Sequence, residues 1–320
     1  MLRLIIGFSI LVTASLVEAA EPPRVWLDTS HGPIVIELND SAAPLTTDRF
    51  LGHVDAGFYD GMVFHRSIDG FMIQSGGFDR DWQPRESPFG TLPSERNNGL
   101  GNMPGTIAMA LRGGDVDSGQ NEFFINLDNN DFLDEDFTVF GEVIHGLATV
   151  ERINALPTGA KAISQQIQFQ DAPMASPFIH RAVRTSGFPI LPAHAGSWFD
   201  PDNSGFGFNI EIAEDENNDD GATALVYWYD YRADEQAWFI GIEPFDHGTS
   251  ELTLDMLSWD GQSPVDFQSP PAEVVPAGTL TIEFTGCASA RFDYDLAEDG
   301  AGELSISRLT LAEQAICDPD

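Results

Sequence analysis

Alternating apolar and polar residues open the part of the chain that follows residue 23. In RVWLDTSHGPIVIEL, residues 24–38, two alternating runs flank an HG dipeptide, and this pattern predicts a β-hairpin. The next stretch has a helical period instead. Pro44 stands at a first-turn position, apolar residues recur at helical spacing, and Gly57 ends the pattern, which predicts an amphipathic helix.

A second helix is predicted in GLATVERINAL, because its apolar residues have helical spacing and Pro157 stops the pattern. The short apolar runs between the two helices, VFHRSI, FMIQS, GTIAMAL, EFFINL and FTVFGEV, are typical of strands. Residues 23–187 are therefore expected to form an antiparallel, mainly β domain with two helices.

The pattern changes after residue 187. Residues 188–195 are rich in proline and small residues and predict a linker. Residues 196–320 contain about seven short alternating runs without helical period, and these predict an acidic all-β domain, a sandwich or a barrel. Charge indicates the same boundary, because residues 188–320 hold 27 acidic and three basic side chains, against 24 and 12 before them.

Residues 1–20 predict an export signal. Arg3 precedes the apolar run Leu4–Val17, and small residues allow cleavage near Ala19 or Ala20. The run is too short to span a bilayer comfortably, although an uncleaved anchor is the alternative. We expect a soluble mature protein, periplasmic or secreted, with no membrane insertion after cleavage.

The net charge of −36 limits the partners. Such a chain is repelled by nucleic acid and by anionic membrane surfaces, so neither is expected as a partner. The histidines are scattered without metal-ligand spacing, and we expect no metal, no cofactor and a monomer. Cys287 and Cys317 are the only cysteines, and in an exported chain they predict a disulfide, with two separate buried thiols as the alternative.

An arginine and a glutamine interrupt the apolar stretch VFHRSIDGFMIQSGG. If residues 63–68 form a strand, Phe64, Arg66 and Ile68 share one face, and Met72 and Gln74 share a face of the next strand. A buried guanidinium needs a partner, since arginine does not lose its proton. Either Arg66 pairs with a carboxylate or it faces a groove that binds a ligand.

The stretch YDGMVFHRSIDGFMIQSGGF resembles the signature of the cyclophilins, a family of peptidyl-prolyl cis–trans isomerases. VWLDTSHGPIVIELNDSAAPLTTDRF resembles their opening hairpin and first helix, and GTIAMAL and NEFFINLDNNDFLDEDFTVFGEVIHG resemble their later strands and loops. The resemblance implies a closed antiparallel barrel of eight strands with two capping helices. It also implies catalysis of rotation about X–Pro bonds in unfolded or flexible polypeptides.

The resemblance also assigns site residues. Arg66 matches the family arginine that stabilises the twisted amide, and Gln74 matches the glutamine that holds the substrate backbone. The remaining matched residues line the proline pocket or contact the substrate, and they are Phe71, Met72, Ala110, Glu122, Phe124, Phe132, Leu133 and Phe137.

Four of the matched positions depart from the family pattern. Glu122 replaces a glutamine and is expected to pair with Arg66 or to alter substrate preference. Phe132 replaces a tryptophan of many members, Phe137 a histidine and Leu111 an asparagine. His65 lies next to Arg66 in sequence, and alternation predicts a structural role for it on the opposite face.

Two features of the tail carry weaker signals. Asp200, Asp202, Ser204, Gly205 and Glu211 have calcium-loop spacing, but the sequence around them alternates like a strand, which favours a turn. The aromatic runs LVYWYDY and AWFIG are expected in the core, with a sugar- or peptide-binding face as the alternative. Two further functions stay open: a non-catalytic proline-peptide binder or chaperone, and a surface- or carbohydrate-binding protein acting through residues 196–320.

Overall fold

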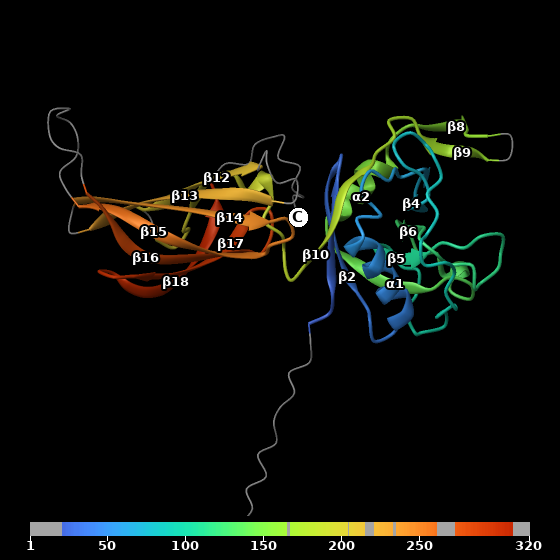
Figure 1. Cartoon of the computed structure of the whole chain (residues 1–320), viewed down its shortest axis with the longest axis horizontal. Coiled ribbons are helices and arrows are strands. Elements are labelled where there is room, and N and C mark those ends of the chain that lie inside the picture. Colours follow the sequence, from blue (N-terminus) through green and yellow to red (C-terminus); the bar gives the residue numbers. More distant parts are fainter. Residues whose placement is uncertain are drawn as a thin grey trace, which may run out of the picture.

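The computed structural model describes residues 21–164, 167–203, 205–214, 221–232, 235–260 and 273–309. They form two β-rich domains placed side by side along the long axis of the molecule (Figure 1). The predicted export signal and Cys317 lie outside these residues, so the signal and the Cys287–Cys317 disulfide stay predictions. Within the described ranges, no helix is long and apolar enough to cross a membrane.

Eight strands of the first domain form one curled antiparallel sheet in the order β10-β1-β2-β7-β5-β6-β4-β3. Its two edges are linked next to β3 and β10, because the backbone N–H of Phe64 donates to Pro177 and that of Ile179 donates to Met62. The strands of the domain are β1 (Arg24–Thr29), β2 (Gly32–Leu38), β3 (Arg66–Ile68), β4 (Met72–Ser75), β5 (Thr106–Met109), β6 (Phe123–Asn126), β7 (Val139–His145) and β10 (Ile179–Thr185), with β8 (Thr158–Ala162) and β9 (Gln168–Pro173) in a separate hairpin.

Both predicted helices are confirmed. The first, α1 (Pro44–Asp55), begins at its proline, and Gly57 follows with a φ of 61° that suits glycine. The second, α2 (Leu147–Asn154), ends shortly before Pro157. Each helix places apolar side chains in the core of the first domain, among them Phe50 from α1 and Val150 from α2.

The inside of the curled sheet is the core of the first domain, and the structure corrects one expectation there. Phe64 is fully buried in this core, whereas Ile68 contacts an apolar cluster on the outer surface. The regular strand β3 begins only at Arg66, so the alternation does not extend back to residue 64. Phe64 therefore does not share a face with Arg66.

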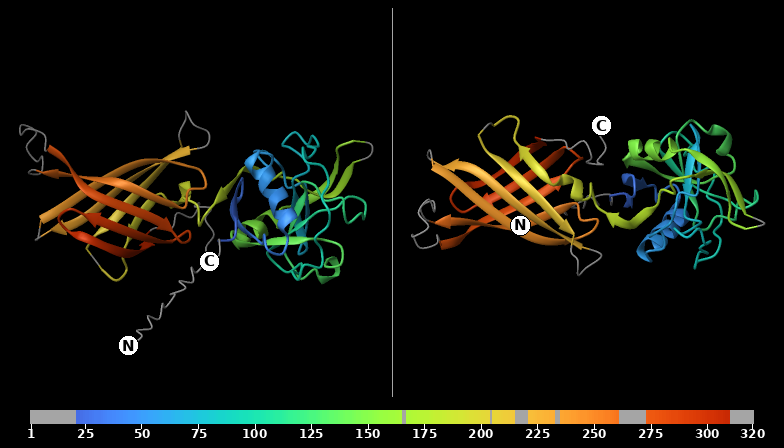
Figure 2. Two further views of the ribbon diagram at one scale, coloured as in Figure 1. Left: turned by 60° about the horizontal axis from the view of Figure 1, so that its bottom comes forward. Right: turned by 90° about the horizontal axis from the view of Figure 1, so that it is seen from above.

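The second domain is a closed barrel of eight antiparallel strands, so the all-β prediction is confirmed (Figure 2). Closure pairs the first strand with the last, because Trp198 lies opposite Arg308. The strands are β11 (Gly196–Phe199), β12 (Gly207–Glu214), β13 (Gly221–Arg232), β14 (Glu235–Asp246), β15 (Glu251–Asp260), β16 (Glu273–Phe284), β17 (Ser289–Leu296) and β18 (Gly300–Arg308).

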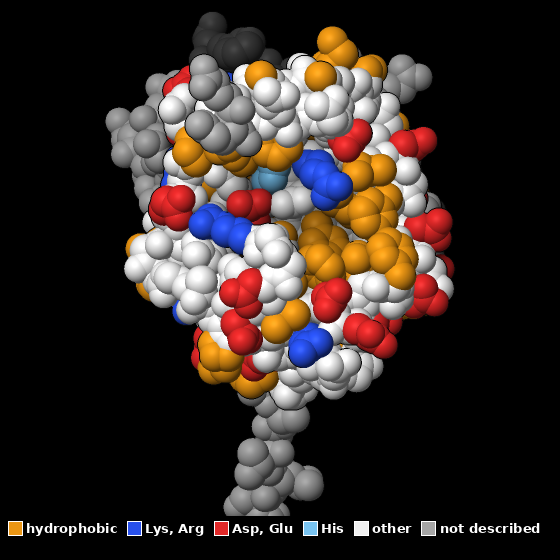
Figure 3. All heavy atoms as spheres, turned by 90° about the vertical axis from the view of Figure 1, so that its right-hand side faces the viewer, with side chains coloured by type: hydrophobic (Ala, Val, Ile, Leu, Met, Phe, Trp, Pro, Cys, Tyr) orange, Lys and Arg blue, Asp and Glu red, His pale blue; other side chains and the backbone are white. Residues whose placement is uncertain are grey.

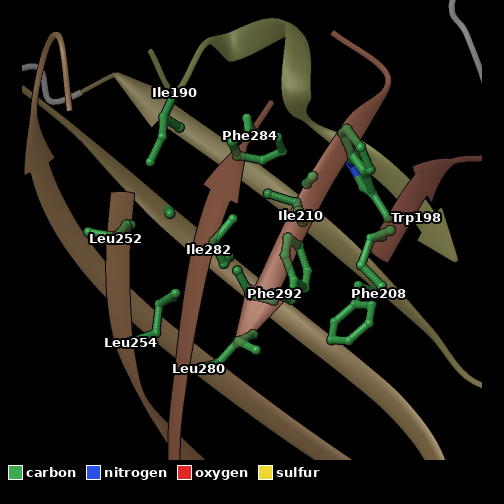
Figure 4. Packing of buried hydrophobic residues seen from close by; sticks show 14 of the residues in the cluster. Ile190, Trp198, Phe208, Ile210, Leu252, Leu254, Leu280, Ile282, Phe284 and Phe292 are labelled. Atoms are coloured by element: carbon green, nitrogen blue, oxygen red, sulfur yellow. The ribbon is translucent and has the colours of Figure 1, made fainter. Parts of the chain in front are cut away.

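Large apolar side chains fill the barrel, among them Trp198, Phe208, Phe284 and Phe292 (Figure 4). The aromatic runs of the tail are only partly in this core. Trp228 and Phe239 point inward and are almost fully buried, whereas Tyr229, Tyr231 and Trp238 point outward and are exposed. The expectation that these runs are core is therefore correct for alternate residues only.

The two domains share a core where the barrel covers the β1–β2 hairpin. Trp26 and Val35 lie opposite each other on the outer face of that hairpin and belong to the same apolar cluster as the barrel interior. The predicted linker, residues 188–195, contributes to this shared core, because Phe188 and Ile190 are buried in the same cluster. Gly248, with a φ of 91°, lies so close to the Arg184 carbonyl that a side chain would not fit.

Charged groups also meet at this junction. Arg181 of β10 contacts the His247 ring and lies 3.4 Å from the Asp28 carboxylate. Glu214 of the barrel lies 3.0 Å from Nε2 of His247. Burial raises the pKa of Asp28, although His180 and Arg181 oppose the shift.

Candidate active site

The register of the first sheet places the predicted polar residues in one row. Arg66 lies opposite Gln74 in the β3–β4 pair, and Gln74 lies opposite Phe124 in β6. Phe124 in turn lies opposite Ala108 in β5. Because residues directly opposite each other project to the same face of a sheet, these four side chains share the outer face.

An apolar cluster lies beside this row. It has Met72, Ala108, Phe124 and Val139 as buried members, and half-buried side chains pack around them. Six of the predicted site residues meet in it, and these are Phe71, Met72, Ala110, Phe124, Leu133 and Phe137. The cluster is completed by four residues that were not predicted as site residues, Ala108, Val139, Ile68 and Leu100.

Aromatic rings form the walls of the cluster. Phe132 stacks on Phe71 with ring centroids 5.8 Å apart and stays 67% exposed, so it forms an outer rim. The rings of Phe137 and Phe124 pack edge to face, with their centroids 5.4 Å apart. In Figure 3, hydrophobic side chains gather on one part of the first-domain end of the molecule, beside basic side chains, and a histidine is visible in a hollow next to them.

Buried amides hold the loop that supplies Phe132. The Nδ2 group of Asn130 donates to the Phe71 carbonyl, at 3.1 Å. The Asp134 carboxylate accepts two hydrogen bonds from Asn102, each of 2.8 Å. These bonds fix both ends of the short 3₁₀ turn Asp131–Leu133 against the sheet.

Arg66 is half-buried, and its guanidinium has no hydrogen bond or ion pair to any described residue. The sequence left two possibilities for Arg66, pairing with a carboxylate or contact with a ligand. Among the described residues no carboxylate pairs with it, which favours contact with a ligand. The guanidinium therefore borders the apolar cluster with its donors free for a ligand.

Glu122 contacts Gln74 and not Arg66, which corrects one expectation from the sequence. Its Oε2 accepts a hydrogen bond of 2.8 Å from Nε2 of Gln74 and lies 3.4 Å from Nε2 of His65. Burial acts to raise the pKa of Glu122, but the hydrogen bonds from His65 and Gln74 and the charge of Arg112 leave it lowered. Glu122 is therefore ionised at neutral pH.

His65 is the buried residue that contacts the Glu122 carboxylate. The side chain is 1% exposed and packs against Phe78 and Phe169, with ring centroids 5.1 and 5.3 Å away. The prediction of a structural histidine agrees with this burial, but its contact with Glu122 was missed. Sequence spacing holds no signal for a contact across 57 residues.

Other candidate sites lie elsewhere. Asp200 forms a turn in which its carboxylate accepts from the backbone of Asp202 and from Asn203. Among the residues that the structure describes, no group of three potential ligands could hold a metal ion. A cavity of about 280 Å³ lies between α1 and the loop with Phe89 and Leu92, and no residue of the row that begins at Arg66 lines it.

Comparison with known proteins identifies relatives of the first domain. The family described as "Cyclophilin type peptidyl-prolyl cis-trans isomerase/CLD" matches residues 24–174. The peptidyl-prolyl cis-trans isomerase cyp18 of Streptomyces antibioticus is 42% identical over 154 residues, which cover 46% of this chain and 92% of that protein. Peptidyl-prolyl cis-trans isomerase B of Escherichia coli is 39% identical over 155 residues, with 46% and 93% covered. A crystal structure of a Cryptosporidium parvum cyclophilin covers 52% of this chain and 99% of its own, at 23% identity and a TM-score of 0.43.

Proposed function

Since the chain belongs to the family of cyclophilin-type peptidyl-prolyl cis–trans isomerases, we propose that it isomerises X–Pro bonds of exported proteins, with Arg66 as the catalytic residue. The observation that carries the proposal is the row of Arg66, Gln74 and Phe124 across three neighbouring strands. It sets a free cation and a carboxamide along one edge of an apolar cluster.

The chemistry needs only a donor in a fixed place. Rotation about an X–Pro bond crosses a barrier of about 18–20 kcal/mol because amide resonance must be broken. As the bond twists, the prolyl nitrogen becomes pyramidal and gains a localised lone pair. A guanidinium N–H aimed at this nitrogen stabilises the twisted state more than either planar state, and only such differential stabilisation accelerates the reaction.

The neighbours of Arg66 orient the substrate. The apolar cluster around Met72 and Phe124 has the character of a pocket for the proline ring. Because the Glu122 carboxylate can only accept, Gln74 must direct its N–H group toward it. The Oε1 atom of Gln74 is then available for a backbone N–H of the substrate.

The export of the substrates rests on the predicted signal in residues 1–20 and on the predicted disulfide. N-terminal sequencing of the purified mature protein after cell fractionation tests this part. We expect the chain to begin near Ala20 or Glu21 in the periplasmic or secreted fraction. An intact Met1 in the cytoplasmic fraction would contradict it and leave the isomerase proposal untouched.

The decisive experiment measures cis–trans exchange of a short X–Pro peptide by NMR. We expect fast exchange with the mature protein and roughly a hundredfold loss of kcat/KM in Arg66→Ala. Arg80→Ala, which removes an exposed arginine that stacks on Phe178, serves as the matched control and should retain activity.

Two results would contradict the role of Arg66 or the activity itself. An Arg66→Ala variant as active as the control would assign catalysis elsewhere. If the folded protein exchanges the peptide no faster than buffer but still binds it, the chain is a non-catalytic proline-peptide binder, which the departures at Glu122, Leu111 and Phe137 would explain.

A further inference from the structure

The outer surface of the β13–β14 hairpin carries exposed aromatic and aliphatic side chains. Tyr229 lies opposite Trp238 and their rings meet edge to face at 5.0 Å. The exposed fractions are 59% for Tyr231, 58% for Ile242 and 52% for Trp238. We call this surface the outer aromatic face, and it consists of Tyr227, Tyr229, Tyr231, Trp238, Ile242 and Leu257.

The barrel does not need this face for its own packing. Its interior is already filled by the alternate residues of the same strands, such as Trp228 and Phe239. Grouped exposed apolar side chains on a soluble domain mark an interaction site. Because the barrel is closed, a partner has no free strand edge to pair with there and must be recognised through side chains.

The negative charge around the outer aromatic face favours a cationic partner. Glu211 in β12 and Asp255 in β15 are exposed beside it, and neither forms an ion pair with a described residue. Arg291 is held by Glu283 at 2.6 Å, and Arg308 donates to a backbone carbonyl. With 27 acidic side chains against three basic ones in residues 188–320, an anionic partner would be repelled.

The neighbours of the rings favour a polypeptide over a carbohydrate. Tyr227 lies opposite Ile240, and Leu225 lies opposite Ile242, so aliphatic groups surround the aromatic ones on the strand face. Sugar hydroxyl groups pressed against such a surface would lose hydrogen bonds to water without replacement. Lysine or arginine side chains of a polypeptide can stack on the rings, while the apolar side chains of the same polypeptide are buried against the aliphatic groups of the face.

We propose that the outer aromatic face binds unfolded polypeptide segments that combine basic with apolar side chains. The face lies on the second domain, and the site row lies on the first, so this binding does not require proline. It gives the chain a second contact for a client whose X–Pro bond occupies the first domain.

The test uses a proline-free fluorescent peptide of alternating lysine and leucine residues, titrated with the full-length mature protein in an anisotropy assay. A peptide with glutamate in place of lysine is the charge control. We expect binding of the lysine peptide only, weakened roughly tenfold in the double variant Tyr231→Ser/Trp238→Ser. Leu309→Ser, which alters a residue 61% exposed outside the face, is the matched variant and should bind normally.

A charge variant and the isomerase assay complete the design. Asp255→Asn should weaken binding about twofold to threefold at low salt and have little effect at high salt. Isomerisation of a short X–Pro peptide should be unchanged in all of these variants, because the site row lies on the first domain. Equal binding of both peptides, an unaffected double variant, or binding of a neutral oligosaccharide in place of the peptide would overturn the proposal.

Discussion

At the residue scale, Glu122 determines both the orientation of Gln74 and the charge beside the apolar cluster. Its carboxylate is 23% exposed and accepts from Gln74. A family member with glutamine in this place has a neutral amide that can donate or accept. Here the group is acceptor-only and anionic, so the site is expected to discriminate among substrates by charge.

We expect the enzyme to favour peptides with lysine near the proline over peptides with glutamate. In Glu122→Gln this ratio of kcat/KM should fall by about threefold, because a partly exposed charge contributes on the order of 1 kcal/mol. Asp40→Asn changes an exposed carboxylate that does not belong to the cluster and serves as the control. An unchanged ratio in Glu122→Gln would show that this carboxylate acts only on Gln74.

Phe132 is expected to act on binding and not on stability. It is 67% exposed and stacks on Phe71. Phe132→Ala therefore removes the outer rim of the apolar cluster without removing a side chain from the core. We expect KM to rise about threefold to tenfold with kcat nearly unchanged, and the thermal midpoint to stay the same. Phe89→Ala, which alters a ring 47% exposed beside a different cavity, should leave both kinetic constants unchanged.

At the element scale, α1 depends on a residue from outside the helix. Its N-cap, Ala43, has no side chain that could accept a hydrogen bond. The Glu95 carboxylate accepts instead from the backbone N–H groups of Leu45 and Thr46, at 2.9 and 2.7 Å. A carboxylate at this end also interacts favourably with the helix dipole.

We therefore expect Glu95→Ala to lower the free energy of unfolding by about 1–2 kcal/mol. Urea denaturation of the full-length protein measures the change. Glu86→Ala removes a carboxylate that is 74% exposed and should cost less than about 0.5 kcal/mol. Equal effects of the two substitutions would argue against the capping role.

The case of α1 shows where sequence patterns are sufficient and where they fail. Its start at Pro44 and its end before Gly57 follow from local residue types, as do the hairpin and the strands of the barrel. The cap from Glu95 and the contact between His65 and Glu122 do not, because both depend on tertiary proximity. The face of Phe64 was predicted wrongly because β3 starts at Arg66, three residues later than the apolar run that begins at Val63.

The site shows the same division. Residue types and family resemblance identified Arg66, Gln74 and most of the apolar cluster. The aromatic runs of β13 and β14 were expected in the core, which is correct for Trp228 and Phe239 but wrong for Tyr229 and Trp238. Whether an outward aromatic side chain is covered depends on the neighbouring domain and not on its own strand.

At the scale of the whole molecule, two buried histidines make the fold sensitive to acid. Burial lowers the pKa of His194 to about 3 and that of His53 to about 4. Both rings bind a proton near pH 6.5 in the unfolded chain. The unfolded state therefore takes up more protons below pH 6.5, and stability falls as the pH drops from about 6.5 toward 3.

The variant His194→Phe tests this origin. It retains a ring against Phe284, whose centroid lies 3.7 Å from that of His194, and it loses the acceptor for the Leu191 N–H group. We expect lower stability at pH 7, but a slope below pH 6.5 that is less steep by up to about 1.4 kcal/mol per pH unit. Urea denaturation at several pH values measures the slope, and an unchanged slope would contradict the assignment.

The shared core at Trp26 and Val35 has a consequence for the order in which the chain is made. At about 5–20 residues per second, a ribosome needs roughly seven to thirty seconds to add the residues that follow residue 187. Throughout that interval the β1–β2 hairpin of the first domain exposes Trp26 and Val35.

A chain that ends at residue 187 would expose this surface permanently. We expect this shortened chain to self-associate in sedimentation experiments. Trp26→Gln in the same shortened chain should restore the monomer. We therefore expect the second domain to prevent this self-association by covering Trp26 and Val35, and it can do so only after the whole chain has been made.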